Sequence, residues 1–127
     1  MAESLGLGST EEVTAIVRVR YAGDDPISVH RSWVPTDLAP DLSSHDLVNE
    51  QLCVVLESVY GLVMKSVSEQ LEASLAGVEE ARRLAVRPSS PVMILSDTIR
   101  DVSGQAFKYS RIVFRGDRIK LDFTYER

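Results

Sequence analysis

The sequence predicts an α+β fold, in which an antiparallel sheet has helices packed on one side. Two observations lead to this prediction. Residues 12–20 and 26–34 alternate between apolar and polar side chains, and the short turn segment Ala22–Asp25 joins them. The last third of the chain repeats the plan, with strand-like runs separated by turn signals at Val102–Gly104 and Gly116–Asp117. Short turns connect antiparallel neighbours, and two middle segments have helical periodicity, so the expected order is β-β-α-β-α-β-β-β.

The first predicted strand places two arginines on one face of the sheet. Side chains along a strand alternate between its two faces, so residues two apart point the same way. Arg18 and Arg20 have this spacing. The return strand contains the only tryptophan, Trp33. Its alternation phase matches that of Val29, which favours packing in the core or at a dimer interface over stacking against a sugar.

The middle of the chain switches between helical and strand-like patterns. Apolar residues from Leu47 to Val59 recur at the spacing of an amphipathic helix, and Gly61 is a typical helix stop. Residues 63–73 alternate like a strand, and residues 75–84 return to helical spacing. Cys53, the only cysteine, stands in an apolar run and is expected to be buried. A single cysteine excludes an intrachain disulfide.

Composition and charge indicate one domain that does not itself bind nucleic acid. The 127 residues are 44% hydrophobic, which suits one compact core. The net charge is −5, whereas a nucleic-acid binder usually carries a basic face. The sequence contains no apolar stretch of about 20 residues and no signal-peptide pattern, so we expect a cytoplasmic protein without membrane contact.

Motifs for cofactors and catalysis are missing from the sequence. It has no glycine-rich phosphate loop and no cysteine and histidine spacing typical of a metal site, so neither a cofactor nor a metal is expected. The two histidines, His30 and His45, fall on different predicted elements. No motif for a particular catalytic reaction is therefore evident.

Several segments, taken in order, resemble the UTRA domain, the effector-binding domain of HutC-type transcription regulators in the GntR superfamily. They include the strand Val17–Arg20 with the Gly-Asp-Asp-Pro turn that follows it, the predicted helix ending in Tyr60–Gly61, and the closing segment Arg115–Arg118. The resemblance runs from about Leu5 to Tyr125. It implies a chorismate-lyase-like fold and a single UTRA-like effector-binding domain over residues 1–127.

The resemblance also implies that the protein is a small-molecule sensor and not an enzyme. In these regulators a separate N-terminal winged helix-turn-helix domain binds DNA. That domain and the first strand of the family are expected to be absent from this chain. The chain is then expected to bind a small-molecule effector, to form a homodimer and to contact DNA only through the missing domain. Ligand would favour one dimer geometry over another and so set the spacing of the DNA-binding domains.

Four candidate ligand-binding residues follow from the resemblance. Arg18 and Arg20 match the family's Arg-x-Arg pair, whose planar guanidinium groups suit a carboxylate or a phosphate. His30 and Lys108 stand where the family often has glutamate. These differences remove hydrogen-bond acceptors for sugar hydroxyls and add hydrogen-bond donors. The expected effector is therefore anionic. A smaller or more acidic ligand is favoured over an amino-sugar phosphate.

Two alternative functions stay open on the sequence alone. The altered pocket positions are also compatible with a ligand-free dimerisation module, which a sealed or apolar cavity would favour. The related lyase fold is compatible with an enzyme acting on an aromatic diacid, with Arg18 and Arg20 holding its carboxylates. No general acid is evident for such an enzyme.

Overall fold

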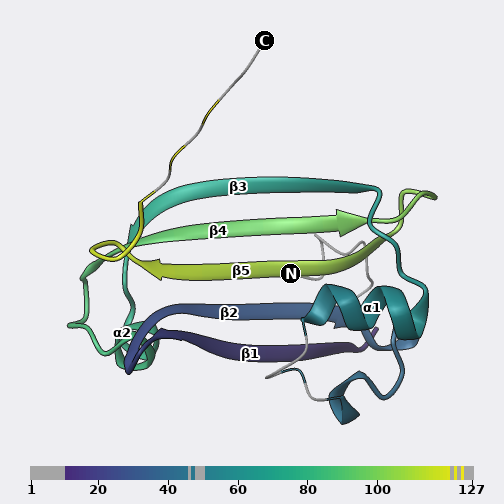
Figure 1. Ribbon diagram of the computed structural model, residues 1–127, viewed down its shortest axis with the longest axis horizontal. Coiled ribbons are helices and arrows are strands. Elements are labelled where there is room, and N and C mark those ends of the chain that lie inside the picture. Colours follow the sequence, from purple (N-terminus) through teal and green to yellow (C-terminus); the bar gives the residue numbers. More distant parts are fainter. Residues whose placement is uncertain (1–10, 46, 48–50, 121, 123, 125–127) are drawn as a thin grey trace.

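An antiparallel sheet forms most of the computed structural model, which describes residues 11–45, 47, 51–120, 122 and 124 (Figure 1). The five strands are β1 (Val13–Ala22), β2 (Asp25–Pro35), β3 (Ser66–Leu75), β4 (Pro91–Arg100) and β5 (Ala106–Arg115). Their order across the sheet is β1-β2-β5-β4-β3, and every neighbouring pair is antiparallel. The helices are α1 (Leu52–Tyr60), α2 (Val78–Leu84) and two short 3₁₀ helices, η1 (Thr36–Leu38) and η2 (Leu42–Ser44).

The predicted α+β class and the antiparallel sheet are confirmed. The helix predicted from Leu47 begins at Leu52 and ends, as expected, before Gly61, which adopts the left-handed conformation that ends many helices. The predicted last strand is not formed at Ile119 and Lys120. Its other apolar residues, Leu121, Phe123 and Tyr125, lie outside the described residues. None of the helices in the described part of the chain is long and apolar enough to cross a bilayer.

The strand register assigns each side chain to one of two faces. Residues directly opposite each other in an antiparallel pair lie on the same face. Arg18 is opposite His30, and their side of the sheet is called the arginine face below. Trp33 is opposite Tyr109, and they define the tryptophan face, to which Val29 also belongs. The predicted phases of Arg18, Trp33 and Val29 agree with this register.

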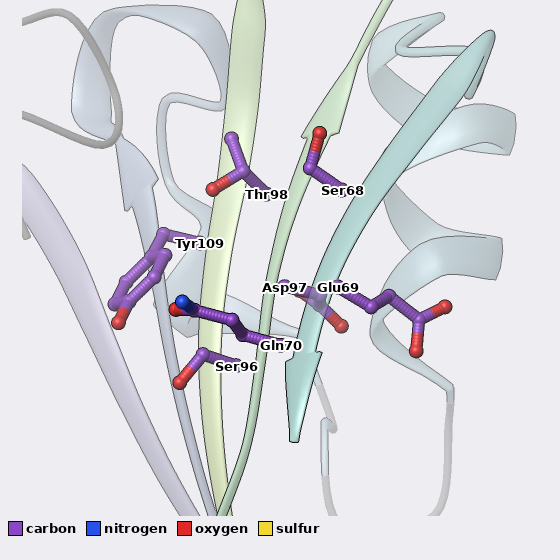
Figure 2. Close-up of a pocket in the computed structure, with 7 residues that line it drawn as sticks. All are labelled: Ser68, Glu69, Gln70, Ser96, Asp97, Thr98 and Tyr109. Atoms are coloured by element: carbon purple, nitrogen blue, oxygen red, sulfur yellow. The ribbon is translucent and has the colours of Figure 1, made fainter. Parts of the chain in front are cut away.

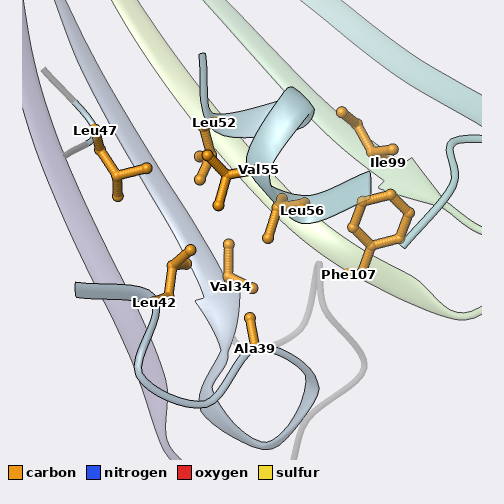
Figure 3. Close-up of a cluster of buried hydrophobic side chains, with 9 residues drawn as sticks. All are labelled: Val34, Ala39, Leu42, Leu47, Leu52, Val55, Leu56, Ile99 and Phe107. Carbon is orange, nitrogen blue, oxygen red and sulfur yellow. The ribbon is translucent and has the colours of Figure 1, made fainter. Parts of the chain in front are cut away.

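The two α-helices lie near opposite ends of the β1–β2 hairpin and pack on different faces (Figure 1). A cluster of buried side chains joins α1 to the arginine face and to the segment after β2 (Figure 3): Val34, Ala39, Leu42, Leu47, Leu52, Val55, Leu56, Ile99 and Phe107. A second cluster joins α2 to the tryptophan face: Val29, Ala76, Ala81, Leu84, Val92, Ile94 and Val113. The structure differs here from the expected single-sided packing. Helical periodicity identifies the apolar side of a helix but not the face of the sheet that it meets.

A β-bulge adds an aromatic ring to the cluster under α1. Ile99 is opposite Lys108, but Arg100 is opposite Ala106, so β5 has one extra residue at this point. A bulge interrupts the strict alternation of side chains. Phe107 therefore joins the cluster under α1, although alternation alone would place it on the tryptophan face.

Ion pairs hold α2 against the sheet. Arg31, on the tryptophan face, donates a hydrogen bond to the carboxylate of Glu80 and lies 3.7 Å from Glu79. Glu79 in turn pairs with Arg83 one helical turn later. The side chain of Glu80 is only 14% exposed, so this pair is largely shielded from water and fixes the position of α2 more firmly than a surface pair would.

The prediction of a buried cysteine is wrong. Cys53 is exposed, whereas its neighbour Leu52 is buried in the cluster under α1. The helix turns by about 100° per residue, so only part of a continuous apolar run can face the sheet. Cys53 and Val54 fall on the outer side of α1.

Candidate functional site

The four residues predicted to bind ligand come from three neighbouring strands and share the arginine face. Arg18 and Arg20 on β1 are opposite His30 and Ser28 on β2. Lys108 on β5 is two residues from Ser110, which is opposite Ser32 on β2. Because Ser28, His30 and Ser32 alternate along one strand, all of these side chains belong to one face. The sheet order β1-β2-β5 thus brings the predicted residues together.

The cations of this face have no acidic partner among the described residues. The ion pairs of the described part involve other cations: Arg31, Arg83, Arg115 and Arg118. Lys108 is nevertheless buried, with only 8% of its surface exposed. A buried charge without a partner is unfavourable, so an anion bound from solution would stabilise this face.

Arg18 is a partly buried cation with a donor that no described residue satisfies. Burial lowers the pKa of Arg18 and the positive charge of Arg20 lowers it further, whereas Cys53 acts in the opposite direction. The Nε atom of Arg18 is buried and has no hydrogen-bond partner among the described residues. An unsatisfied buried donor costs roughly 1–3 kcal/mol, and a bound anion would satisfy it.

The N-terminal turn of α1 contributes to the same region. Leu52, in this turn, belongs to the cluster against which Ile16 packs, and Ile16 is two residues before Arg18 on the same face of β1. The N-cap residue, Gln51, makes no side-chain capping bond, and the first turn contains no acidic residue. Uncapped backbone N–H groups at a helix N-terminus attract anions, so α1 and Arg18 favour the same kind of ligand.

His30 is a neutral member of this cationic group. Its Nε2 atom is hydrogen-bonded to the Ser28 hydroxyl at 2.8 Å, and its ring meets the ring of Phe114 edge-on at 6.2 Å between centroids. Burial is the largest cause and the charges of Arg20, Arg18 and Lys108 add to it, so that together they lower the pKa of His30 to about 4. At neutral pH the imidazole therefore takes part as an uncharged hydrogen-bonding group.

We expect His30 to destabilise the folded protein as the pH falls from about 6.5 to about 4. The folded pKa of about 4 lies below the ordinary value of 6.5, so in this window the unfolded chain binds a proton that the folded chain excludes. Urea unfolding at several pH values measures how the free energy of unfolding changes with pH. In His30→Gln this slope should be smaller by the equivalent of up to about one bound proton. His45→Gln, which also removes one histidine, is the control. An unchanged slope in His30→Gln would contradict the assignment.

The buried polar residues that lie among these cations were not predicted from the sequence. Ser28, Ser32 and Ser110 are almost fully buried, and the hydroxyls of Ser32 and Ser110 are 3.1 Å apart. Asp97 is opposite Ser110, and its Oδ1 atom is buried without a hydrogen-bond partner among the described residues. Ser28 and Ser32 could have been found, because each is two residues from His30 on the same strand and so shares its face. The turn signal at Val102–Gly104 predicted that β4 and β5 pair but not their register, so Asp97 could not be placed opposite Ser110.

Among the described residues, no group of three or more His, Cys, Asp or Glu side chains is placed to hold a metal ion. The arrangement on the arginine face can bind an anion through several donors. The Asp97 carboxylate can also accept a hydrogen bond from a ligand hydroxyl or ammonium group. These are properties of a binding site.

Comparison with known proteins relates the chain to one protein family. The family model of the UTRA domain matches residues 1–120. The HTH-type transcriptional repressor NagR of Bacillus subtilis (strain 168) is 30% identical over 118 residues, which cover 93% of this chain and 48% of that protein. The Mannosyl-D-glycerate transport/metabolism system repressor MngR of Escherichia coli (strain K12) is 24% identical over 127 residues, which cover 100% of this chain and 52% of that protein. The chain thus spans about half the length of these curated relatives.

Solved structures share the fold at lower sequence identity. The C-terminal domain of the histidine utilization repressor from Pseudomonas syringae pv. tomato str. DC3000 superimposes with a TM-score of 0.92 at 20% identity, covering 99% of this chain and 87% of that one. A GntR-family transcriptional regulator from Enterococcus faecalis V583 gives a TM-score of 0.85 at 21% identity, with 98% and 88% covered. These relatives and neighbours are repressors and regulators rather than enzymes.

Proposed function

The chain belongs to the UTRA domain family, and we propose that it is the effector-binding domain of a DNA-binding transcription regulator. The observation that carries this proposal is the group of cations on the arginine face, which lacks acidic partners among the described residues. In the proposal, Arg18, Arg20, His30 and Lys108 bind an anionic small molecule. DNA is bound by a separate domain of the longer regulator.

Each side chain has a distinct task in this proposal. The guanidinium groups of Arg18 and Arg20 hold the anionic group of the effector through paired, charge-assisted hydrogen bonds. Lys108 supplies a further positive charge from β5, and neutral His30 supplies a hydrogen bond from β2. Asp97 accepts a hydrogen bond from a hydroxyl or ammonium group at the other end of the molecule. The effector therefore combines an anion with at least one donor.

Regulation in this proposal depends on a homodimer. The edge strand β3 is exposed along its whole length, and its arginine-face side carries the exposed apolar side chains of Val67, Leu71 and Leu75, with Glu69 between the first two. Exposed sheet edges that carry apolar side chains are commonly covered by another chain, which supports dimerisation. Effector binding shifts the population between two dimer geometries. The shift can be no larger than the difference in effector affinity between those geometries.

A thermal-shift screen tests the proposed function. Sulfate, sugar phosphates, dicarboxylates and phosphonates should include an anion that raises the melting temperature of this domain by several degrees. A ligand at about 100 times its dissociation constant adds about 2.7 kcal/mol of stability. The uncharged analogue of each hit, such as the sugar without its phosphate, is the control and should give a much smaller shift. A folded dimer that no anion stabilises would contradict the proposal and favour a ligand-free dimerisation module.

A further inference from the structure

A pocket of about 210 Å³ opens near the β3 edge of the sheet (Figure 2), lined by Ser68, Glu69, Gln70, Ser96, Asp97, Thr98 and Tyr109. Ser68 is opposite Thr98, Gln70 is opposite Ser96, and Thr98 is opposite Tyr109. Since Tyr109 is opposite Trp33, these five lining side chains belong to the tryptophan face. The pocket is therefore on the other side of the sheet from Arg18 and Arg20.

The functional groups that face this pocket are uncharged. Glu69 and Asp97 line it, but they are opposite each other on the arginine face. Figure 2 shows Glu69 pointing away from the side on which Gln70 and Tyr109 lie. Arg111, opposite Ser96 on the tryptophan face, is not among the lining residues. What remains is four hydroxyls and one amide, and each of these groups can both donate and accept hydrogen bonds.

These polar groups are free to bind a ligand. Among the described residues, the side chains of Ser68, Gln70, Ser96, Thr98 and Tyr109 form no hydrogen bond with other protein groups. The helix α2 covers the tryptophan face only over its other end, where it packs on Val92, Ile94 and Val113. Groups that donate and accept with equal ease match the hydroxyls of a polyol, which do the same.

An aromatic pair forms one wall of the pocket. The ring of Tyr109 stacks on that of Trp33, with 5.5 Å between centroids and 25° between planes. In the sheet order β2-β5-β4-β3, Trp33 lies on one side of Tyr109, and Thr98 and Gln70 lie on the other. Stacking therefore supports one ring face of Tyr109 and leaves its pocket side available. An aromatic face beside hydroxyl groups suits the C–H and O–H surfaces of a sugar.

We propose that this pocket is a second ligand site, which binds an uncharged polyhydroxylated molecule of about the size of one sugar unit. The volume lies below the roughly 300–1,000 Å³ of sites for drug-sized ligands, which limits the ligand to a small one. The site is separate from the arginine face and selects for different chemistry. It goes beyond the proposed function, since it implies that the same domain binds a second kind of ligand.

The only tryptophan of the chain provides a direct test, because Trp33 touches the wall of the pocket. Titration with glucose, mannose and mannitol should change the Trp33 fluorescence to saturation at a concentration on the order of 1 mM for at least one of them. Thr98→Val, which keeps the side-chain shape, and Gln70→Leu should each weaken that binding by at least about tenfold. Arg18→Ala, on the other face, should leave it unchanged.

Saturation-transfer NMR on the same samples detects binding that leaves the fluorescence unaltered. No binding of any of the three probes by either method would overturn the proposal. Binding that is lost in Arg18→Ala but retained in Thr98→Val would also overturn it, because the sugar would then occupy the arginine face. A Trp33 signal that follows protein concentration instead of sugar concentration would overturn it as well, because the face would then be a contact between two copies of the chain.

Discussion

The Leu56→Ala protein should unfold with a free energy about 2–5 kcal/mol smaller than that of the unchanged protein. Leu56 has no exposed surface and lies at the centre of the cluster that joins α1 to the arginine face (Figure 3). Its truncation removes buried methyl groups and leaves a cavity that the sheet cannot close. Since small domains are stable by only about 5–15 kcal/mol, the loss is a large share of the total.

Urea unfolding followed by circular dichroism measures this loss, and Val54→Ala on the same helix is the matched control. Val54 is 58% exposed on the outer side of α1, so its truncation should cost no more than about 0.5 kcal/mol. Similar losses from the two changes would mean that α1 does not pack as described. The comparison also tests the site, because α1 carries the N-terminal turn beside Arg18.

Alternation within single strands predicted the part of the site that β1 and β2 supply. It placed Arg18 and Arg20 on one face of the sheet, and it placed Trp33 on the same face as Val29. Both results need only the period of two that any strand has. The same reasoning could not show that β5 lies between β2 and β4, which is what brings Lys108 to the face of His30. Strand order depends on contacts between distant segments.

The remaining differences also come from tertiary packing. The rotation of α1 about its axis decides which of its many apolar residues face the sheet, and so whether Cys53 is exposed. The bulge at Phe107 is an interruption of the pairing between β4 and β5, which neither strand reveals alone. Trp33 belongs to neither core cluster and instead stacks on Tyr109 from the neighbouring strand. Trp33 therefore lies on the predicted face but outside the core, and its predicted alternative place at a dimer interface stays a prediction.

The double change Arg18→Ala and Arg20→Ala should weaken binding of the best anion from the thermal-shift screen by at least about 100-fold. A hydrogen bond to a charged group contributes about 1.5–3 kcal/mol, and each 1.4 kcal/mol is a factor of ten in affinity. Isothermal titration calorimetry at low salt measures the loss. Arg111→Ala removes the same side chain from the tryptophan face and should change the affinity by less than about threefold.

The stability of the unliganded proteins separates a binding role from a structural one. Arg18 and Arg20 have no acidic partner among the described residues, and each repels the other across one face. Their removal should therefore leave the melting temperature of the free protein unchanged or raise it, while the stabilisation by the anion disappears. Arg18→Lys keeps the charge but loses the planar fork, so it should bind with intermediate affinity. A free protein that melts earlier but binds the anion normally would show that the two arginines support the fold and not the effector.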